Sequence, residues 1–184
     1  EKYGFPIEPT DSATLDEMTL GTSHGGFAAV CTMRSLQPLT PDDILPGQFA
    51  VWIEGIEDPY NFGYALRSLY ACGVDLVVLS PRNWMHAAGV VCRSSAGASE
   101  LLPMYVAADE TVTDWFHDKG YKIACAGIRD SVSSFDADLT KPLFLIVGGE
   151  KRGISRKLLD RADLIVRIDY GRAFRGSLSA ASAC

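Results

Sequence analysis

Short runs of consecutive apolar residues recur along the chain from Phe49 onward, and they alternate with segments whose apolar residues stand three or four positions apart. Such runs are typical of strands buried on both faces of a parallel sheet. They lie at residues 49–53, 74–79, 121–127, 143–147 and 164–168. The segments with helical spacing lie at residues 64–72, 84–96, 110–119 and 155–162. The alternation predicts an α/β fold in which helices cover both faces of a mostly parallel sheet.

The two ends of the chain lack this pattern. Residues 1–20 contain Pro6 and Pro9 and little periodicity, so we expect a linker or the tail of a preceding module there, with the main domain at residues 21–184. The chain begins without Met and stops inside the small-residue run 177–184, which predicts the first turns of a helix. We therefore expect both ends to be trimmed and this last helix to be incomplete.

Composition narrows the classes of protein. The chain has 184 residues, of which 47% are hydrophobic and 22% charged, as in ordinary globular proteins. No apolar run approaches the roughly 18 residues of a membrane span, and no signal peptide is visible. The five cysteines form no CxxC pair, which favours reduced thiols in a cytoplasmic protein. The net charge of −6 argues against bulk coating of nucleic acid, but a local basic patch could still grip phosphates.

Ligands of open parallel sheets bind beyond the carboxyl ends of the strands, so the loops there carry the candidate chemistry. In the first loop, residues 54–75, Asp58 and Pro59 can start a helix that carries Asn61 and Arg67. These two residues could bring an amide and a guanidinium to the mouth of a site. The alternative for Arg67 is an ordinary surface charge on the helix.

The second loop, residues 148–155, is rich in glycine, and its exposed backbone N–H groups could bind a ligand edge or an anion. Ile154 stands where a phosphate loop needs Lys, which argues against binding of a nucleoside triphosphate. Glu150 could hold Arg67 or a ligand amine. Five cations follow and form either a solvated helix face or a phosphate-binding patch: Lys151, Arg152, Arg156, Lys157 and Arg161.

The third loop, residues 168–184, carries Arg172 and Arg175 around a glycine-containing stretch. Other chemistries find no support in the sequence. It has no HExxH, no GxSxG and no zinc pattern, and its three histidines are scattered. We therefore expect no metal site.

Together and in this order, the three loops resemble the motifs of the SpoU or TrmH family of SPOUT RNA methyltransferases. The matching segments are EDPYNFGYALRS (57–68), LIVGGEKRGIS (145–155) and RIDYGRAFRGSLSAASA (167–183). Two further segments support the resemblance, SHGGFAA (23–29) and RSSAGASELLPMYV (93–106). The resemblance covers about residues 21–184.

The resemblance implies a C-terminal deep trefoil knot, a homodimer and transfer of a methyl group from S-adenosylmethionine to a ribose 2′-hydroxyl of RNA. It implies that Arg67 activates the hydroxyl, that Asn61 orients it and that Glu150 positions Arg67. Because a guanidinium is a poor base, we expect Arg67 to organise the hydroxyl and the adjacent phosphate. The main-chain groups expected to hold the cofactor belong to Val147, Gly148, Gly149, Ile168, Ser177 and Leu178. The cations expected to contact RNA are Lys151, Arg152, Arg172 and Arg175.

The sequence also departs from the family pattern. Ser179 replaces the usual Asn of the third motif, and Asp169 and Tyr170 stand where Pro and Met are common. The linker-like start favours ribosomal RNA over transfer RNA as the substrate, since it suggests a missing N-terminal RNA-binding module. Two other functions stay open: a catalytically weak SPOUT-fold protein that binds RNA, and a Rossmann-like enzyme that uses a nucleotide.

Overall fold

The computed structural model describes residues 4–19, 21–32, 34–43, 45–81, 87–149 and 151–184. The chain forms two compact units, Glu1–Met33 and Arg34–Cys184. The first contains helix α1 (Ser12–Met18), where Asp11 accepts a 2.8 Å hydrogen bond from the backbone N–H of Thr14 and so caps the helix. His24 Nε2 lies 3.0 Å from Asp16 Oδ1 and ties the following segment to this helix. The expectation of a linker at residues 1–20 did not include α1, because seven residues show little helical periodicity.

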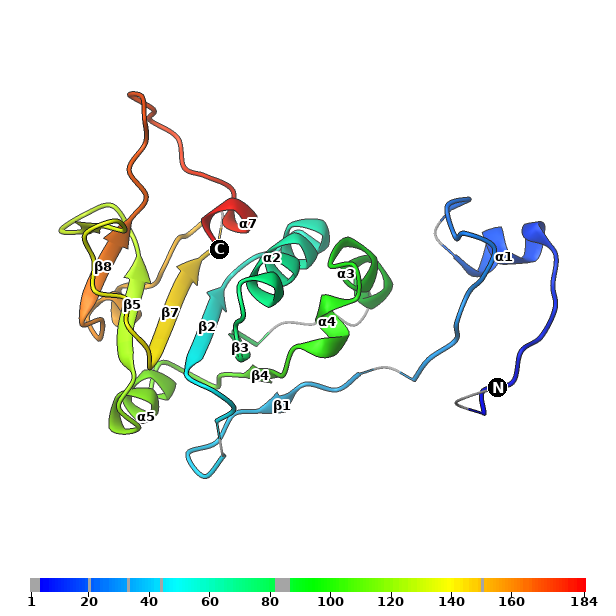
Figure 1. Cartoon of the computed structure of the whole chain (residues 1–184), viewed down its shortest axis with the longest axis horizontal. Helices are drawn as coiled ribbons and strands as arrows, with labels where there is room; N and C mark the ends of the chain where they lie inside the picture. Colours follow the sequence, from blue (N-terminus) through cyan, green and yellow to red (C-terminus); the bar gives the residue numbers. More distant parts are fainter. Residues whose placement is uncertain (1–3, 20, 33, 44, 82–86, 150) are drawn as a thin grey trace. The chain divides into compact units, whose positions relative to one another are not determined.

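In the described part of the second unit, eight strands form one sheet in which every paired strand is parallel (Figure 1). Their order is β1-β4-β3-β2-β7-β5-β8-β6. The strands are β1 (Gln37–Pro38), β2 (Phe49–Glu54), β3 (Leu76–Leu79), β4 (Met104–Val106), β5 (Lys122–Ala126), β6 (Val132–Ser133), β7 (Leu143–Gly148) and β8 (Leu164–Arg167). All five strands expected from the sequence are present, and the prediction of a parallel α/β sheet is confirmed.

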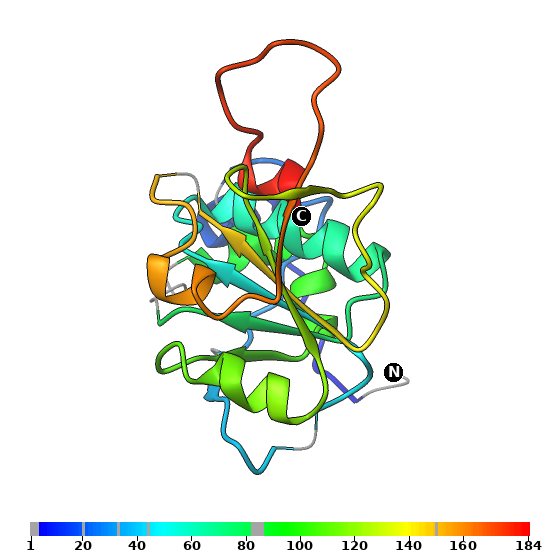
Figure 2. The same ribbon diagram turned by 90° about the vertical axis from the view of Figure 1, so that its left-hand side faces the viewer.

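Helices cover both faces of this sheet (Figure 2). On one face α5 (Val112–Asp118) and α6 (Arg156–Leu159) bury Phe116 and Leu158 against the strands. On the other face lie α2 (Pro59–Ala71), α3 (Ala88–Ser94), α4 (Ala98–Leu101) and α7 (Ala180–Ala183). Successive residues of β2 contribute to opposite cores, since Trp52 packs in the first and Ile53 in the second. This explains why the strands are continuous apolar runs.

Helix α2 follows directly from its sequence. Asp58 accepts a 2.8 Å hydrogen bond from the backbone N–H of Asn61, and Pro59 occupies the first helical position. One face of the helix buries Phe62, Ala65, Leu66 and Leu69. A side chain at Gly63 would collide with Ser94 Oγ, 1.8 Å from the position of a Cβ atom, so this glycine permits the close contact between α2 and α3.

The chain after β8 leaves the sheet as an extended loop and returns at α7, next to α2 and β7 (Figure 2). Residues 171–179 are exposed, and Ala180 at the start of α7 is buried in the core that α2 shares. The expected helix at the end of the chain is therefore present in short form. The trefoil knot implied by the resemblance stays a prediction. None of the helices in the described residues is both long and apolar enough to cross a membrane.

Candidate active site

The carboxyl ends of four neighbouring strands, β2, β7, β5 and β8, lie at one edge of the sheet. Because they are parallel, the loops that follow them share this edge. The register pairs Glu54 with Gly148 at the ends of β2 and β7, and Ala126 with Val166 near the ends of β5 and β8. The structure thus brings together the three loops that the sequence nominated.

The loop after β7 folds back on itself and presses against the loop after β2. Gly149 forms an isolated antiparallel bridge with Gly153. A Cβ atom on Gly149 would lie 2.2 Å from the Gly55 carbonyl oxygen, and one on Gly148 would lie 2.4 Å from the Gly153 carbonyl carbon. The glycines are needed here for contact between backbones, which the sequence alone did not indicate.

A pocket of about 380 Å³ lies beside this loop, between the loops that follow β2, β3 and β7. Glu54 Oε2 accepts a 2.8 Å hydrogen bond from the backbone N–H of Ser155 and fixes the approach to α6. Lys151 Nζ lies 2.6 Å from Glu57 Oε2, and both residues line the pocket. Two predicted RNA contacts, Lys151 and Arg152, therefore line this hollow.

The residues expected to hold the cofactor fall into two groups. Val147 is buried in β7, and Gly148 and Gly149 are half-buried at its end. Ile168 follows β8 directly and is 47% exposed, while Ser177 and Leu178 lie in the exposed segment that leads to α7. The backbone N–H of Leu178 donates a 3.3 Å hydrogen bond to Tyr170 Oη.

Within the described residues, the main chain of residues 168–178 makes no hydrogen bond to another backbone group. Apart from the Leu178 N–H, which donates to Tyr170 Oη, main-chain donors and acceptors without a backbone partner therefore lie beside the exposed side chains of Ile168 and Leu178. A flat aromatic ring with polar edges, such as adenine, needs this combination of apolar contact and hydrogen-bonding groups. The segment fits the adenosyl part of the expected cofactor.

The sequence did not identify the loop after β5 as part of this edge. Strand β5 lies between β7 and β8, so Gly127 and Ile128 follow it between two loops expected to hold the cofactor. Ile128 is exposed, and the backbone N–H of Gly127 donates a 2.8 Å hydrogen bond to Val166. The segment carries no recognisable motif, but the rule that ligands bind at the carboxyl ends of parallel strands would have nominated it.

The two candidate side chains on α2 differ in their surroundings. Arg67 is exposed and makes no hydrogen bond or ion pair with any residue that the structure describes. Asn61 is half-buried in the first turn. Six helical residues correspond to about 9 Å along the axis and about 120° around it, so the two side chains leave the helix on different sides. Glu150 lies outside the described residues.

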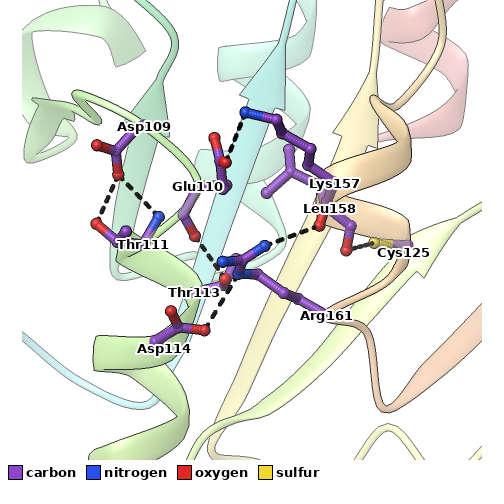
Figure 3. A network of polar contacts seen from close by, with 9 residues as sticks. All are labelled: Asp109, Glu110, Thr111, Thr113, Asp114, Cys125, Lys157, Leu158 and Arg161. Atoms are coloured by element: carbon purple, nitrogen blue, oxygen red, sulfur yellow. Dashed lines mark hydrogen bonds and ion pairs between the residues drawn. The ribbon is translucent and has the colours of Figure 1, made fainter.

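Most of the cations that follow the glycine loop are held by carboxylates. Lys157 Nζ lies 2.9 Å from Glu110 Oε1, and Arg161 Nε lies 3.2 Å from Asp114 Oδ1, in a network between α6 and the start of α5 (Figure 3). The hydrogen bond from Lys157 holds the pKa of Glu110 below its ordinary value. Arg156 pairs with Asp160 at 2.8 Å. Arg152, in contrast, has no such partner in the described part of the chain.

The structure also bears on metal binding. Among the described residues, no group of three or more His, Cys, Asp or Glu side chains could hold a metal ion. His24 and His117 each lie near a single carboxylate, Asp16 at 3.0 Å and Asp163 at 3.7 Å.

Comparison with known proteins agrees with this geometry. Residues 48–184, which contain all three motif loops, match the SpoU rRNA Methylase family. The chain belongs to this family. The resemblance seen in the sequence is confirmed, and so is the fold class.

Relatives of the SpoU rRNA Methylase family extend over most of the chain. The 23S rRNA (guanosine-2′-O-)-methyltransferase RlmB of Shewanella oneidensis is 28% identical over 173 residues, which cover 90% of this chain and 70% of that protein. An uncharacterized tRNA/rRNA methyltransferase of Mycobacterium avium is 31% identical over 176 residues, 90% of this chain and 55% of that protein.

Solved structures show the same fold. The AdoMet-bound rRNA methyltransferase from Sinorhizobium meliloti superimposes with a TM-score of 0.71 at 25% identity, covering 82% of this chain and 57% of that one. The chain thus spans little more than half the length of several proteins that it resembles.

Proposed function

We propose that this chain is the catalytic part of an RNA methyltransferase that uses S-adenosylmethionine to methylate a ribose 2′-hydroxyl. The observation that carries the proposal is the family match over residues 48–184, which includes Arg67 and the loops after β7 and β8. The named activities of its relatives, RlmB above all, support ribosomal RNA as the substrate.

The cofactor would rest on main-chain groups at the end of β7, at Ile168 and at Leu178. When bound, it supplies a methyl group that a sulfonium already activates for transfer. The protein therefore has mainly to exclude water, to align the attacking hydroxyl and to raise its nucleophilicity. Val147, Gly148 and Gly149 would shape one wall of this site, and Ser177 would shape the other.

Arg67 is the side chain proposed to hold the reacting ribose. Its exposed guanidinium has no protein partner among the described residues, so its five N–H donors remain free for the hydroxyl oxygen and the adjacent phosphate. A guanidinium with a pKa above about 12 is a poor base, and its role here is to bind and orient. Asn61 would orient the hydroxyl from the first turn of α2, and Glu150 would position Arg67.

Methyl transfer from isotopically labelled S-adenosylmethionine tests this function. The full-length protein is incubated with unmodified ribosomal RNA and, separately, with transfer RNA, and the label is mapped by nuclease digestion and mass spectrometry. We expect label on a ribose 2′-oxygen of ribosomal RNA. Arg67→Ala should reduce the rate at least about 100-fold, as removal of a group that acts on the reacting oxygen does.

The matched control is Arg156→Ala, which also removes one exposed guanidinium but one paired with Asp160 on α6. It should keep nearly the full rate. Label on transfer RNA alone would show that transfer RNA, and not ribosomal RNA, is the substrate. Absence of both label and cofactor binding would contradict the proposed activity, and retention of NAD instead would favour a nucleotide-using enzyme.

A second candidate is an RNA-binding protein that transfers methyl groups weakly or not at all. It is favoured by Ser179, whose side chain accepts a hydrogen bond from the backbone N–H of Ser182 at the start of α7 and is thus occupied as a helix cap. This candidate predicts RNA binding that survives Arg67→Ala, together with negligible turnover in the unaltered protein.

We further propose a homodimer in the cytoplasm. The family resemblance supports the dimer, and light scattering coupled to gel filtration tests it, since the mass should be twice that of one chain. Free thiols at all five cysteines are compatible with a reducing compartment. Imaging of a tagged full-length protein tests the location.

A further inference from the structure

Cations of the described residues fall into two classes. Lysines and several arginines are engaged by carboxylates, carbonyls or a ring, as in the network of Figure 3. Other arginines are exposed and have no hydrogen bond, ion pair or ring contact in the part of the chain that the structure describes. This second class consists of Arg67, Arg129, Arg152, Arg172 and Arg175.

Arg67 lies on α2, and the other four members of the second class share a location in the topology. Arg129 follows β5, Arg152 follows β7, and Arg172 and Arg175 follow β8, and these three strands are neighbours in the sheet. An ion pair largely neutralises a cation, whereas an unpaired guanidinium keeps its donors and its charge for an incoming anion. In a chain of net charge −6, unpaired arginines gathered at one edge give that edge a local positive character.

Arg129 stands on a turn that the structure holds at several points. The backbone N–H of Gly127 donates to Val166 at 2.8 Å, and Ser131 Oγ donates to the Ile128 carbonyl at 2.7 Å. Asp130, at φ +52°, reverses the chain directly after Arg129. A side chain on a fixed turn loses less conformational entropy on binding than one on a free loop.

Arg167 joins this turn to the loop that carries the other arginines. Its Nη1 donates to the Ser131 carbonyl, and its Nε donates to Asp169 Oδ1 at 2.7 Å. Hydrogen bonds from Ser133 and Arg167 hold the pKa of Asp169 below its ordinary value, so this carboxylate is charged and already committed. The Asp169 carboxylate therefore forms no ion pair with Arg129. The exposed carboxylate next to Arg129 in the sequence is that of Asp130.

We propose that Arg129 binds a backbone phosphate of the substrate RNA, in one row with Arg152, Arg172 and Arg175. The inference rests on the proposed function, because RNA is the polyanion that this edge would meet there. A guanidinium presents a planar fork that matches two phosphate oxygens. The contact adds affinity and fixes the position of the RNA along this edge of the sheet. It takes no part in the transfer of the methyl group.

The salt dependence of RNA binding tests the inference. Binding of unmodified ribosomal RNA to the full-length protein is measured over a range of KCl concentrations, for the unaltered protein and for Arg129→Ala. Each phosphate contact contributes about 0.7 to 0.9 to the slope of log K against log salt. We expect Arg129→Ala to reduce that slope by this amount and to weaken binding several-fold, whereas Arg129→Lys should keep most of the slope.

The matched control is again Arg156→Ala, which changes the net charge equally but removes a cation paired with Asp160. Its slope should fall clearly less than that of Arg129→Ala, because Asp160 already offsets most of the charge of Arg156. In turnover measurements Arg129→Ala should raise KM for RNA while kcat at saturating RNA and the affinity for S-adenosylmethionine stay unchanged.

The failures of the two proposals can be told apart. If the unaltered protein methylates RNA and Arg129→Ala shows an unchanged slope, the inference is wrong and the proposed function stands. If the unaltered protein binds RNA without transferring methyl groups and Arg129→Ala lowers the slope, the inference stands and the enzymatic proposal fails. If the unaltered protein does not bind RNA, both are wrong.

Discussion

Lys151 Nζ lies 2.6 Å from Glu57 Oε2, so a cation predicted to bind RNA is held by a carboxylate from the neighbouring loop. The two side chains are 74% and 40% exposed. Exposed ion pairs are worth at most about 1 kcal/mol, and a phosphate can displace the carboxylate at modest cost. The pair thus reduces what Lys151 contributes to RNA binding without abolishing it.

Glu57→Gln should tighten RNA binding, because it removes a negative charge from the lining of the pocket and releases Lys151 from its ion pair. The expected gain is a few-fold at low salt, with a slope of log K against log salt up to about 0.9 steeper. Lys151→Ala should weaken RNA binding less than Arg152→Ala does. Lys151 must break its ion pair with Glu57 before it binds a phosphate, whereas Arg152 has no ion pair among the described residues. Equal losses for these two variants would show that the pair does not restrain Lys151.

The strands were predictable because burial on both faces leaves a continuous apolar run. Strands β2 and β7 begin at the predicted residues, Phe49 and Leu143, and each ends one residue later than predicted. Strands β1 and β6 have only two residues each and show no pattern. Their pairing depends on neighbouring strands and not on local sequence.

The partners of the basic residues could not be predicted. Arg161 meets Asp114, 47 positions away, because α5 and α6 pack side by side on one face of the sheet. A run of five cations looks uniform in sequence, but tertiary packing pairs Lys151, Lys157 and Arg161 with distant carboxylates. Arg156 pairs locally with Asp160, four residues on, and Arg152 is left without a carboxylate among the described residues. Arg129 was missed for the opposite reason, since a single arginine in a loop shows its lack of a partner only in three dimensions.

Gly149→Ala should destabilise the protein, because its Cβ would lie 2.2 Å from the Gly55 carbonyl oxygen. Relief of such a clash costs about 1–3 kcal/mol, which corresponds to a fall in Tm of several degrees for a chain of this length. The displaced loop should also weaken binding of S-adenosylmethionine. Thermal unfolding and calorimetric titration measure the two effects.

Gly89→Ala is the control for that variant. Gly89 lies inside α3 and has no atom within 4 Å of its Cβ position, so alanine there should be neutral or stabilise the helix by up to about 1 kcal/mol. If both variants had the same Tm, close contact between the two loops would not be the reason for glycine at position 149.

Cys125 should make stability fall at alkaline pH. Burial, together with the charge of Glu54, raises the pKa of its thiol from 9.0 to about 12. The folded chain therefore keeps the proton to about pH 12, whereas the unfolded chain loses it near pH 9. The stabilisation is complete below pH 9 and is lost as pH rises from 9 to 12, with a slope of at most about 1.4 kcal/mol per pH unit.

Urea unfolding at several pH values measures this loss, and Cys125→Ala should show a shallower decline than the unaltered chain. The Cys125 thiol donates a 3.8 Å hydrogen bond to the Leu158 carbonyl, in the buried corner drawn in Figure 3. Thiol reagents at pH 8 should accordingly modify the exposed Cys72 and spare Cys125 in the folded protein. Rapid modification of Cys125 would contradict its burial.

Ser179→Asn separates the enzyme from the weak or inactive alternative. Ser179 caps α7, where its Oγ accepts a 3.2 Å hydrogen bond from the backbone N–H of Ser182. Asn caps a helix about as well as Ser, so the variant should fold with unchanged stability while it restores the amide that the family usually carries there. Ser179→Ala should cost about 1 kcal/mol of folding stability, because it removes the cap. If serine limits catalysis, Ser179→Asn should raise kcat several-fold and leave the RNA affinity unchanged. An unchanged kcat in an active protein would mean that serine serves the reaction as well as asparagine does, and that the departure from the family pattern is no argument for an inactive protein.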